Sequence, residues 1–467
     1  MKIAKLAVLT LLAAIPGVFA AGKGMIADYA SVISEAQARA DGHHHVDSAA
    51  TVAVVRALHA NTYFFLVHGQ ADWDDMRNEF LPAAAKAGLD VWLYFVPPSE
   101  CLAPCVLPFT NDYVRIAAET ARLSLTYPNL KGMAIDDFAD NLKLYTPEYA
   151  GRMRGAGREV NPAFQFYPLL YWRSMLPAFL DEYAPAIDGV ILAYRDEPTI
   201  NTSRNTSLRA QLDAAEGMMS ARSKGLVLMV YCAPLGRIPI PPEAAYVRDS
   251  VAMGLEDMRA GKLAGVVTYK LSKSGVPAPA AENYAHGGRG RATILASGNG
   301  IPSGSYGEIS SRITVTSGAA SVRFWQTALY TKLPPGYFFL QLLVDDRVAW
   351  EQDVSGVESK LWKQESVDLS AALAGKREAT LRLRLALKRG TGSIAVIAGV
   401  DDLEPAGFRL ADPGLEDPRQ WKPAQTATAF LPMVQYFDPE RPARMLDAVR
   451  ELYGRQWAGA ILPFRAG

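Results

Sequence analysis

The chain has 467 residues, of which 49% are hydrophobic and 21% are charged, with 48 basic and 48 acidic side chains. This composition is typical of a globular protein, and the length indicates roughly two or three domains. A net charge of zero argues against a nucleic-acid partner, because such proteins need a basic surface to neutralise phosphates. Three cysteines are too few for disulfide bonds to carry the fold.

The N-terminus predicts export. Lys2 and Lys5 stand before an apolar run over residues 6–19, and small residues around Ala20 resemble a signal-peptidase site. We therefore expect residues 1–20 to be a signal peptide and the mature protein to be secreted or periplasmic. No later stretch is long and apolar enough to predict a membrane span.

The cysteines divide into a close pair and a single residue. Cys101 and Cys105 flank a short loop, so a local disulfide bond is compatible with export. Cys232 falls in an apolar strand without an evident basic partner. We expect it to be a buried free thiol rather than a nucleophile.

Between about residues 41 and 273 the sequence alternates apolar strands with amphipathic helices. Eight parallel strands and about 230 residues are typical of a (β/α)₈ TIM barrel. The first of these strands is short and polar. We expect a barrel domain over residues 22–287, with strands at 43–46, 62–68, 91–96, 132–137, 164–170, 189–194, 226–232 and 265–271.

A different pattern begins near residue 288. Short alternating strands separated by Gly, Ser and Pro predict an antiparallel β-sandwich, jelly-roll-like, over residues 288–412. Trp325, Trp350 and Trp362 lie in it, and each could pack between the sheets or offer a platform to a sugar. Residues 413–467 form a C-terminal extension that resembles a strand-helix-strand unit, at 429–437, 443–453 and 458–464.

Two strands of the barrel run directly into acidic residues. Side chains alternate along a strand, so Ala134 and Asp136 point into the barrel when Met133 and Ile135 face the helices. Polar side chains at the C-terminal ends of barrel strands converge on one cleft. The sixth strand repeats this arrangement: with Ala193 inward, Arg195 and Glu197 fall on the cleft side.

A buried strand that closes as Gly-x-x-aliphatic-Asp, here residues 132–136, resembles the nucleophile strand of retaining TIM-barrel glycoside hydrolases, including the α-amylase-like and α-galactosidase-like groups. The resemblance covers the barrel and the barrel-plus-sandwich layout. It implies that Asp136 is the nucleophile and that the acid/base comes from strand six, at Glu197 or Asp196. The arginine that α-amylase-like enzymes carry two residues before the aspartate is Ala134 here, so their substrates do not transfer.

Cleavage of a glycosidic bond needs one protonated and one ionised carboxyl group. The sequence predicts Asp136 as nucleophile or base and Glu197 as general acid, with Asp137 and Asp196 as further catalytic candidates. For Asp137 and Asp196 the alternative is a structural role, capping the following helices or binding loop amides. No cofactor is expected, because neither a phosphate-binding glycine loop nor a nucleophile elbow occurs in a suitable context.

Aromatic and polar residues gather at the predicted strand ends, as expected of a cleft that binds a carbohydrate substrate. Tyr171, Tyr194 and Gln70 belong to this group. The candidate substrate-binding residues are His43, His45, His68, Tyr94, Tyr167, Trp172, Arg195, Tyr231, Tyr269 and Lys270.

Two other classes of function remain open. The His43-x-His45 pair resembles the opening of metal-dependent amidohydrolase barrels, but the fifth and sixth strands lack the histidines that would complete such a site. A role of these histidines in holding a substrate hydroxyl is the alternative. The third possibility is a catalytically silent glycan-binding protein, which the sandwich would suit.

Overall fold

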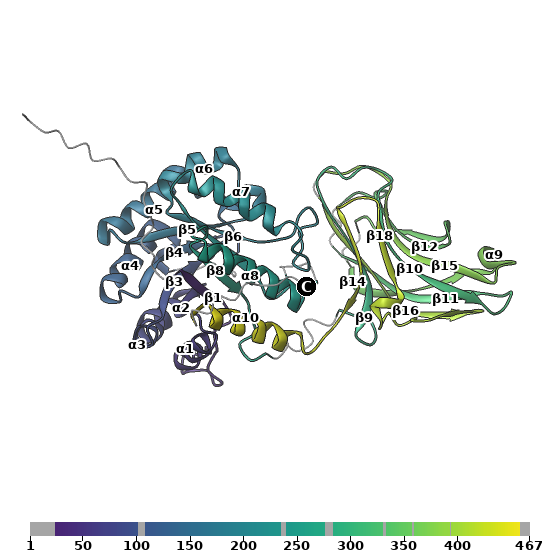
Figure 1. The fold of residues 1–467 in the computed structure, drawn as a ribbon, viewed down its shortest axis with the longest axis horizontal. Helices are drawn as coiled ribbons and strands as arrows, with labels where there is room; N and C mark the ends of the chain where they lie inside the picture. The colour runs from purple at the N-terminus through teal and green to yellow at the C-terminus, as the bar shows by residue number, and fades with distance from the viewer. Residues whose placement is uncertain are drawn as a thin grey trace, which may run out of the picture.

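The computed structural model describes residues 24–100, 108–234, 240–275, 284–329, 333–356, 359–392 and 394–457. The predicted signal peptide, the Cys101–Cys105 pair and the predicted strand at 458–464 lie outside these residues. Figure 1 shows a barrel with its helices beside an elongated body made of antiparallel strands. The predicted fold class, a TIM barrel followed by a β-sandwich, is confirmed.

Eight parallel strands close the barrel in sequence order. They are β1 (Met25–Tyr29), β2 (Thr62–Val67), β3 (Asp90–Phe95), β4 (Leu130–Ile135), β5 (Gln165–Leu170), β6 (Gly189–Ala193), β7 (Gly225–Tyr231) and β8 (Gly265–Tyr269). The helices around them are α1 (Ser48–Ala57), α2 (Gln70–Asp75), α3 (Leu81–Lys86), α4 (Tyr113–Thr126), α5 (Pro147–Val160), α6 (Pro177–Tyr183), α7 (Leu208–Ser220) and α8 (Ala244–Arg259). Helix starts follow local chemistry: the Asp112 carboxylate accepts from the amides of Val114 and Arg115 to cap α4.

The prediction of the first strand was wrong. Residues 43–46 belong to the loop between β1 and α1, and the barrel begins instead with β1. The fourth of the five residues of β1 is charged, and a charged residue is typical of surface sequence. Asp28 is fully buried there, where it pairs with Lys273 and accepts a 2.8 Å hydrogen bond from Thr268.

The strand register agrees with the alternation predicted for β4 and β6. Ala134 and Ala193 belong to the packed interior of the barrel, whereas Met133 and Ile135 pack between the strands and the helices. The barrel is thus filled by side chains, and only residues beyond the strand ends are free to build a site. Asp136 is the first residue after β4.

The second body contains two antiparallel sheets. One has the order β13-β12-β15-β10-β17, with β18 also paired to β10, and the other has the order β14-β11-β16-β9-β19. The strands are β9 (Gly290–Gly298), β10 (Tyr306–Val315), β11 (Ser321–Leu329), β12 (Phe338–Val344), β13 (Arg347–Asp353), β14 (Ser359–Asp368), β15 (Glu378–Leu387), β16 (Ile394–Ala406), β17 (Phe408–Leu410), β18 (Lys422–Gln425) and β19 (Phe430–Tyr436), with the short helix α9 (Ser370–Leu373). β18 and β19 therefore complete sandwich sheets, and the segment after residue 412 is not a separate unit.

The three tryptophans of the sandwich have different surroundings. Trp350 packs against the core between the sheets and meets Phe324 edge to face. Trp325 stacks on the ring of His286 with centroids 4.1 Å apart, and Trp362 meets the same ring edge-on at 5.6 Å. His286 lies in the connection from the barrel, so these two tryptophans hold the connection against the sandwich.

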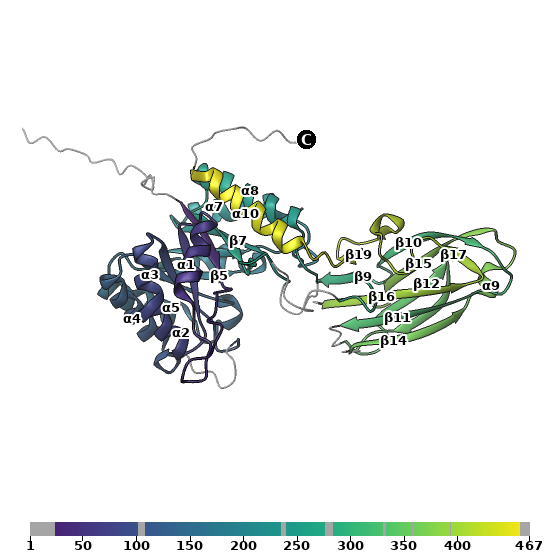
Figure 2. The same ribbon diagram turned by 90° about the horizontal axis from the view of Figure 1, so that it is seen from below.

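The chain returns from the sandwich to the barrel. Helix α10 (Arg441–Trp457) lies alongside α8, as the yellow ribbon in Figure 2 shows. Met445, Val449 and Tyr453 join the core between the strands and the helices, and the Tyr453 hydroxyl donates to the Ala27 carbonyl oxygen at 2.9 Å. The last helix thus fastens the first strand of the barrel.

Replacing Tyr453 by Phe is expected to lower the free energy of unfolding by about 1–2 kcal/mol, because it removes this buried hydrogen bond without opening a large cavity. Urea denaturation followed by circular dichroism measures the change. Tyr436, at the end of β19, is partly exposed. Tyr436→Phe serves as the control and should leave the transition in place, and an equal loss in both variants would contradict the fastening role.

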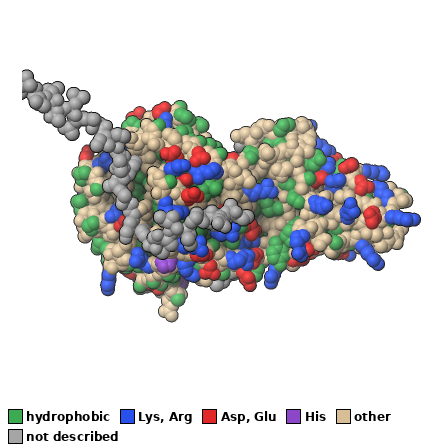
Figure 3. Space-filling model, in the orientation of Figure 1, with side chains coloured by type: hydrophobic (Ala, Val, Ile, Leu, Met, Phe, Trp, Pro, Cys, Tyr) green, Lys and Arg blue, Asp and Glu red, His purple; other side chains and the backbone are tan. Residues whose placement is uncertain are grey.

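Charged side chains of both signs are mixed over the face of the molecule that Figure 3 shows. This mixing matches the equal numbers of acidic and basic residues in the sequence. Among the described residues, no helix has the length and apolar character needed to cross a bilayer.

Candidate active site

Asp136 lies at the C-terminal rim of the barrel, directly after β4. Its Oδ1 accepts a 3.1 Å hydrogen bond from the Tyr94 hydroxyl and a 3.0 Å hydrogen bond from the Asp137 amide. Both donors favour the ionised carboxylate. Burial acts in the opposite direction and dominates, so the pKa of Asp136 is raised to about 7. Asp137 is the next cause of this increase, through its charge.

Asp137 turns toward the same cleft because the strand has already ended. Its backbone is left-handed, with φ of 39°, a conformation that Asp adopts more readily than most residues. The side chain makes no capping hydrogen bond to the short helix that follows, Phe138–Asn141. Among the described residues, nothing forms a hydrogen bond with its buried Oδ1 by standard geometry. The predicted capping role is therefore absent.

Glu100, in the loop after β3, contributes a third carboxyl group. The residue as a whole is exposed, but its carboxyl end approaches the cleft and shares a hydrogen bond with the Asp137 side chain. Desolvation, this hydrogen bond and the charges of Asp137 and Asp136 raise the pKa of Glu100 to about 8. Three interacting carboxyl groups thus hold at least one proton near neutral pH.

Five tyrosines surround this group of acids. Tyr29 stacks on Tyr94 at 4.0 Å and on Tyr269 at 4.9 Å, and Tyr231 meets Tyr269 edge to face at 5.1 Å. Burial and then the charge of Asp136 raise the pKa of Tyr29, Tyr94 and Tyr269, which places these three phenols near Asp136. The same charge also raises the pKa of Tyr171 and Tyr231.

Two cations lie at the rim. Lys270 follows β8 in a left-handed conformation, with φ of 55°, and its charge lowers the pKa of both Asp136 and Glu100. Arg195 follows β6, and its guanidinium carbon lies 3.5 Å from the centre of the Tyr171 ring. The charge of Lys270 therefore acts on Asp136 and Glu100, whereas Arg195 stacks on Tyr171.

Glu197 and Asp196 behave differently from each other. Asp196 is buried and accepts hydrogen bonds from the Ser207 amide at 2.7 Å and from the Tyr194 and Thr206 hydroxyls, which is the structural role of binding a loop amide. Glu197 is half-buried, and burial raises its pKa against the charges of Arg195 and Arg173. No interaction links Glu197 to Asp136 or Asp137 among the described contacts.

Several predicted substrate-binding residues lie away from the acids. Tyr167 contacts Gly189 and Gly225, which begin β6 and β7, so it fills the floor of the barrel. Trp172 packs partly against the core outside the strands. His68 is exposed, and its ring lies 4.0 Å from the Asp72 carboxylate.

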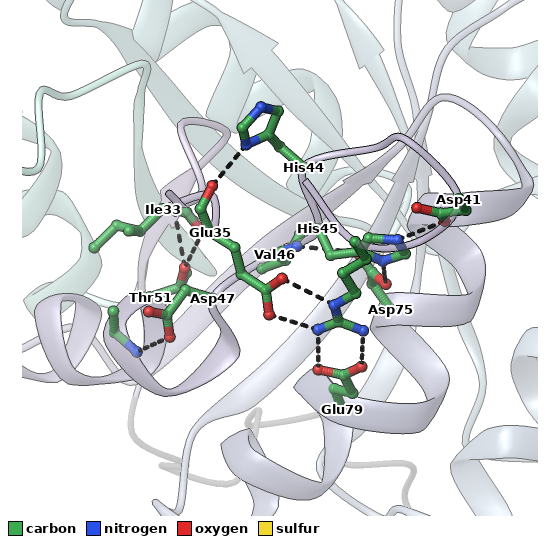
Figure 4. Close-up of polar contacts among 12 residues, drawn as sticks. Ile33, Glu35, Asp41, His44, His45, Val46, Asp47, Thr51, Asp75 and Glu79 are labelled. Carbon is green, nitrogen blue, oxygen red and sulfur yellow. Dashed lines mark hydrogen bonds and ion pairs between the residues drawn. The ribbon is translucent and has the colours of Figure 1, made fainter. Parts of the chain in front are cut away.

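The histidines of the β1–α1 loop are part of a separate polar cluster, shown in Figure 4. The His45 ring lies between Asp75, at 2.5 Å, and Asp41, at 2.7 Å. Arg39 forms forked ion pairs with Glu35 in the same loop and with Glu79 in the helical segment Met76–Phe80. His43 is exposed and touches Asp41 only through its amide. Hydrogen bonds and ion pairs therefore hold this loop in place, as Figure 4 shows. The described residues contain no group of three or more His, Cys, Asp or Glu side chains arranged to hold a metal ion.

Hydrogen bonds to Asp75 and then Asp41 raise the pKa of His45. Because the folded pKa is above the unfolded value of about 6.5, the stabilisation of the loop is complete below that pH and disappears as the pH rises through the folded pKa. We expect proteolysis of the loop to accelerate over this pH range in the wild type and to be fast at every pH in His45→Gln. His43→Gln is the control, and a profile that His45→Gln leaves unchanged would contradict the role of His45.

Sequence reasoning missed Glu100 and Tyr29. Tyr29 was overlooked because β1 itself was not recognised. Glu100 lies in an irregular loop, where no periodic pattern marks the direction of a side chain. Its position five residues beyond β3, on the same rim as the strand-end acids, was the available signal.

A scan against protein-family models finds no match, and a search of curated proteins finds none. Among solved structures, a glucosidase from Croceicoccus marinus has a TM-score of 0.40 at 9% identity over 81% of this chain and 95% of that one. An α-L-arabinofuranosidase from Thermotoga maritima has a TM-score of 0.38 at 8% identity over 81% and 96%. A mutant of Bacteroides uniformis β-glucuronidase 2 has a TM-score of 0.40 at 9% identity over 80% of this chain, which spans 64% of that enzyme. At these identities the similarity concerns the arrangement of the chain alone.

Proposed function

We propose that the protein is an exported glycoside hydrolase that cleaves a poly- or oligosaccharide at the rim of its barrel. The observation that carries the proposal is the group of three interacting carboxyl groups, Glu100, Asp136 and Asp137, inside a ring of tyrosines. Hydrolysis needs an ionised and a protonated carboxyl group together. Values of the pKa near 7 and 8 supply both near neutral pH.

In this mechanism Asp136 is the nucleophile or the base that activates water. The Tyr94 hydroxyl and the Asp137 amide hold one of its oxygens, which fixes the carboxylate and supports its charge. The tyrosine ring supplies apolar faces for the C–H groups of a sugar and hydroxyls for its edge. Lys270 would moderate the accumulated negative charge.

The general acid has two candidates. Glu197 is the residue that the sequence favours, and burial raises its pKa. We assign the role to Glu100, because Glu100 interacts with Asp136 and Asp137 and its pKa of about 8 keeps it protonated at neutral pH. Asp137 then helps to retain the proton on Glu100.

The test is release of reducing ends from a panel of poly- and oligosaccharides, followed by the pH dependence of kcat/KM on the best substrate. The rate should rise as Asp136 ionises, near pH 7, and fall as Glu100 loses its proton, near pH 8. A bell-shaped profile with its maximum between these values is expected. Turnover of no glycan would contradict the proposal, and activity that vanishes with a chelator and returns with zinc would favour the amidohydrolase alternative.

A further inference from the structure

Arg195 is held at the rim by stacking, and the described residues form no ion pair with it. Its guanidinium carbon lies over the ring of Tyr171, 3.5 Å from the ring centre. This stacking fixes the plane of the guanidinium. The side chain is therefore preorganised before any ligand arrives.

One end of this guanidinium has no partner in the described part of the chain. Nη2 is buried, and no atom of the described residues accepts a hydrogen bond from it. Leaving a buried donor of a charged group unsatisfied is costly, so such a group usually has a ligand or solvent partner. Two of the segments outside the described residues, 101–107 after β3 and 235–239 after β7, contain no Asp or Glu, whereas the segment 276–283 after β8 contains Glu282.

Arg173, a neighbouring arginine, differs from Arg195 because it is paired with a carboxylate. It also lies near the Tyr171 ring, at 5.7 Å, but two of its contacts, 2.8 and 2.9 Å long, go to the Asp140 carboxylate. Glu197 is the acidic residue whose charge interacts with Arg195, yet the described residues contain no ion pair between them. Within the part of the chain that the structure describes, no ion pair therefore neutralises the charge of Arg195.

We propose that Arg195 binds the carboxylate of an acidic sugar unit, so that the substrate of the cleft is a glycan containing uronic acid. The inference rests on the proposed function and names its substrate class. A planar guanidinium presents paired N–H donors that match the two oxygens of a carboxylate. A neutral sugar has no negative charge that could pair with the positive charge of the guanidinium. Tyr171 and Tyr231 would contact the sugar ring beside it.

Four monosaccharides test the inference by isothermal titration calorimetry on the wild-type protein, since monosaccharides contain no bond to hydrolyse. They are glucuronate, galacturonate, glucose and galactose. At least one acidic sugar should bind about 10- to 100-fold more tightly than its neutral counterpart, as expected for a charge-assisted hydrogen bond. Arg195→Gln should remove that difference, Arg195→Lys should restore part of it, and added salt should weaken it.

Two further variants sharpen the result. Arg173→Gln is the matched control, because Arg173 is paired with Asp140, and it should keep the preference for the acidic sugar. Glu197→Gln should strengthen binding of the acidic sugar, because it removes a negative charge near Arg195. Equal affinity for acidic and neutral sugars, or tighter binding of glucose 6-sulfate than of either uronate, would overturn the inference. Hydrolysis of neutral glycans alone would also overturn it and leave the proposed hydrolase intact.

Discussion

Asp136→Asn should lower kcat/KM on the order of a thousand-fold or more, because it removes the group that attacks the sugar or activates water. Asn keeps an oxygen that can accept from the Tyr94 hydroxyl and the Asp137 amide, so the local geometry should survive. Initial rates on the best glycan measure the loss, and circular dichroism verifies the fold.

Asp140→Asn is the matched control. Asp140 is an exposed acid four residues further along the same rim loop, where it pairs with Arg173. It should keep at least half of the wild-type activity. Full activity in Asp136→Asn would remove Asp136 from the mechanism, and an equal loss in both variants would point to disruption of the loop.

The same variant makes a prediction about stability. The pKa of Asp136 is raised from 3.8 to about 7 by folding. Between these pH values the folded state binds the extra proton, so the contribution of Asp136 to the free energy of unfolding falls as the pH rises through this range. At pH 8 Asp136→Asn should therefore be more stable than the wild type, on the order of 2 kcal/mol for a half-buried group. At pH 4 the difference should be small.

The sequence revealed most of the barrel because seven of its strands are apolar runs that need no distant partner to be recognised. β1 was the exception. Asp28 in this strand looks like a surface residue until Lys273, from the other end of the barrel sequence, is placed beside it. At the end of the chain the predicted strand at 429–437 and helix at 443–453 agree with β19 and α10. Their placement was left open, because β19 is defined by its pairing with β9 and α10 by its packing on α8.

The residues of the candidate site likewise divide into those that the sequence located and those that it did not. Asp136, Arg195 and Lys270 directly follow barrel strands or lie one residue beyond them, so alternation and topology were enough to locate them. Tyr167 shows the limit of that argument, because a strand residue can point into the barrel and still lie at its floor. Glu100 was missed because only its position shortly after β3 pointed to the rim, and a loop conformation brings it to Asp137.

The identity of the general acid is the second prediction with a large effect. Glu100→Gln should lower kcat/KM by about 100- to 10,000-fold on substrates with a poor leaving group, because no proton reaches the departing oxygen. Substrates with a good leaving group, such as nitrophenyl glycosides, need less protonation and should lose far less. The alkaline limb of the pH profile, near pH 8 in the wild type, should disappear.

Glu197→Gln is the comparison that decides between the two acids. If Glu100 donates the proton, Glu197→Gln should keep the alkaline limb and show the same fractional loss on good and poor leaving groups. The reverse pattern, with leaving-group dependence in Glu197→Gln and not in Glu100→Gln, would return the acid to the sixth strand, where the sequence first indicated it. Asp137→Asn adds an independent measurement: loss of its negative charge and of its hydrogen bond should lower the pKa of Glu100 and shift the alkaline limb to lower pH. A shift of that limb would tie Glu100 to the proton transfer even if both glutamine variants were slow.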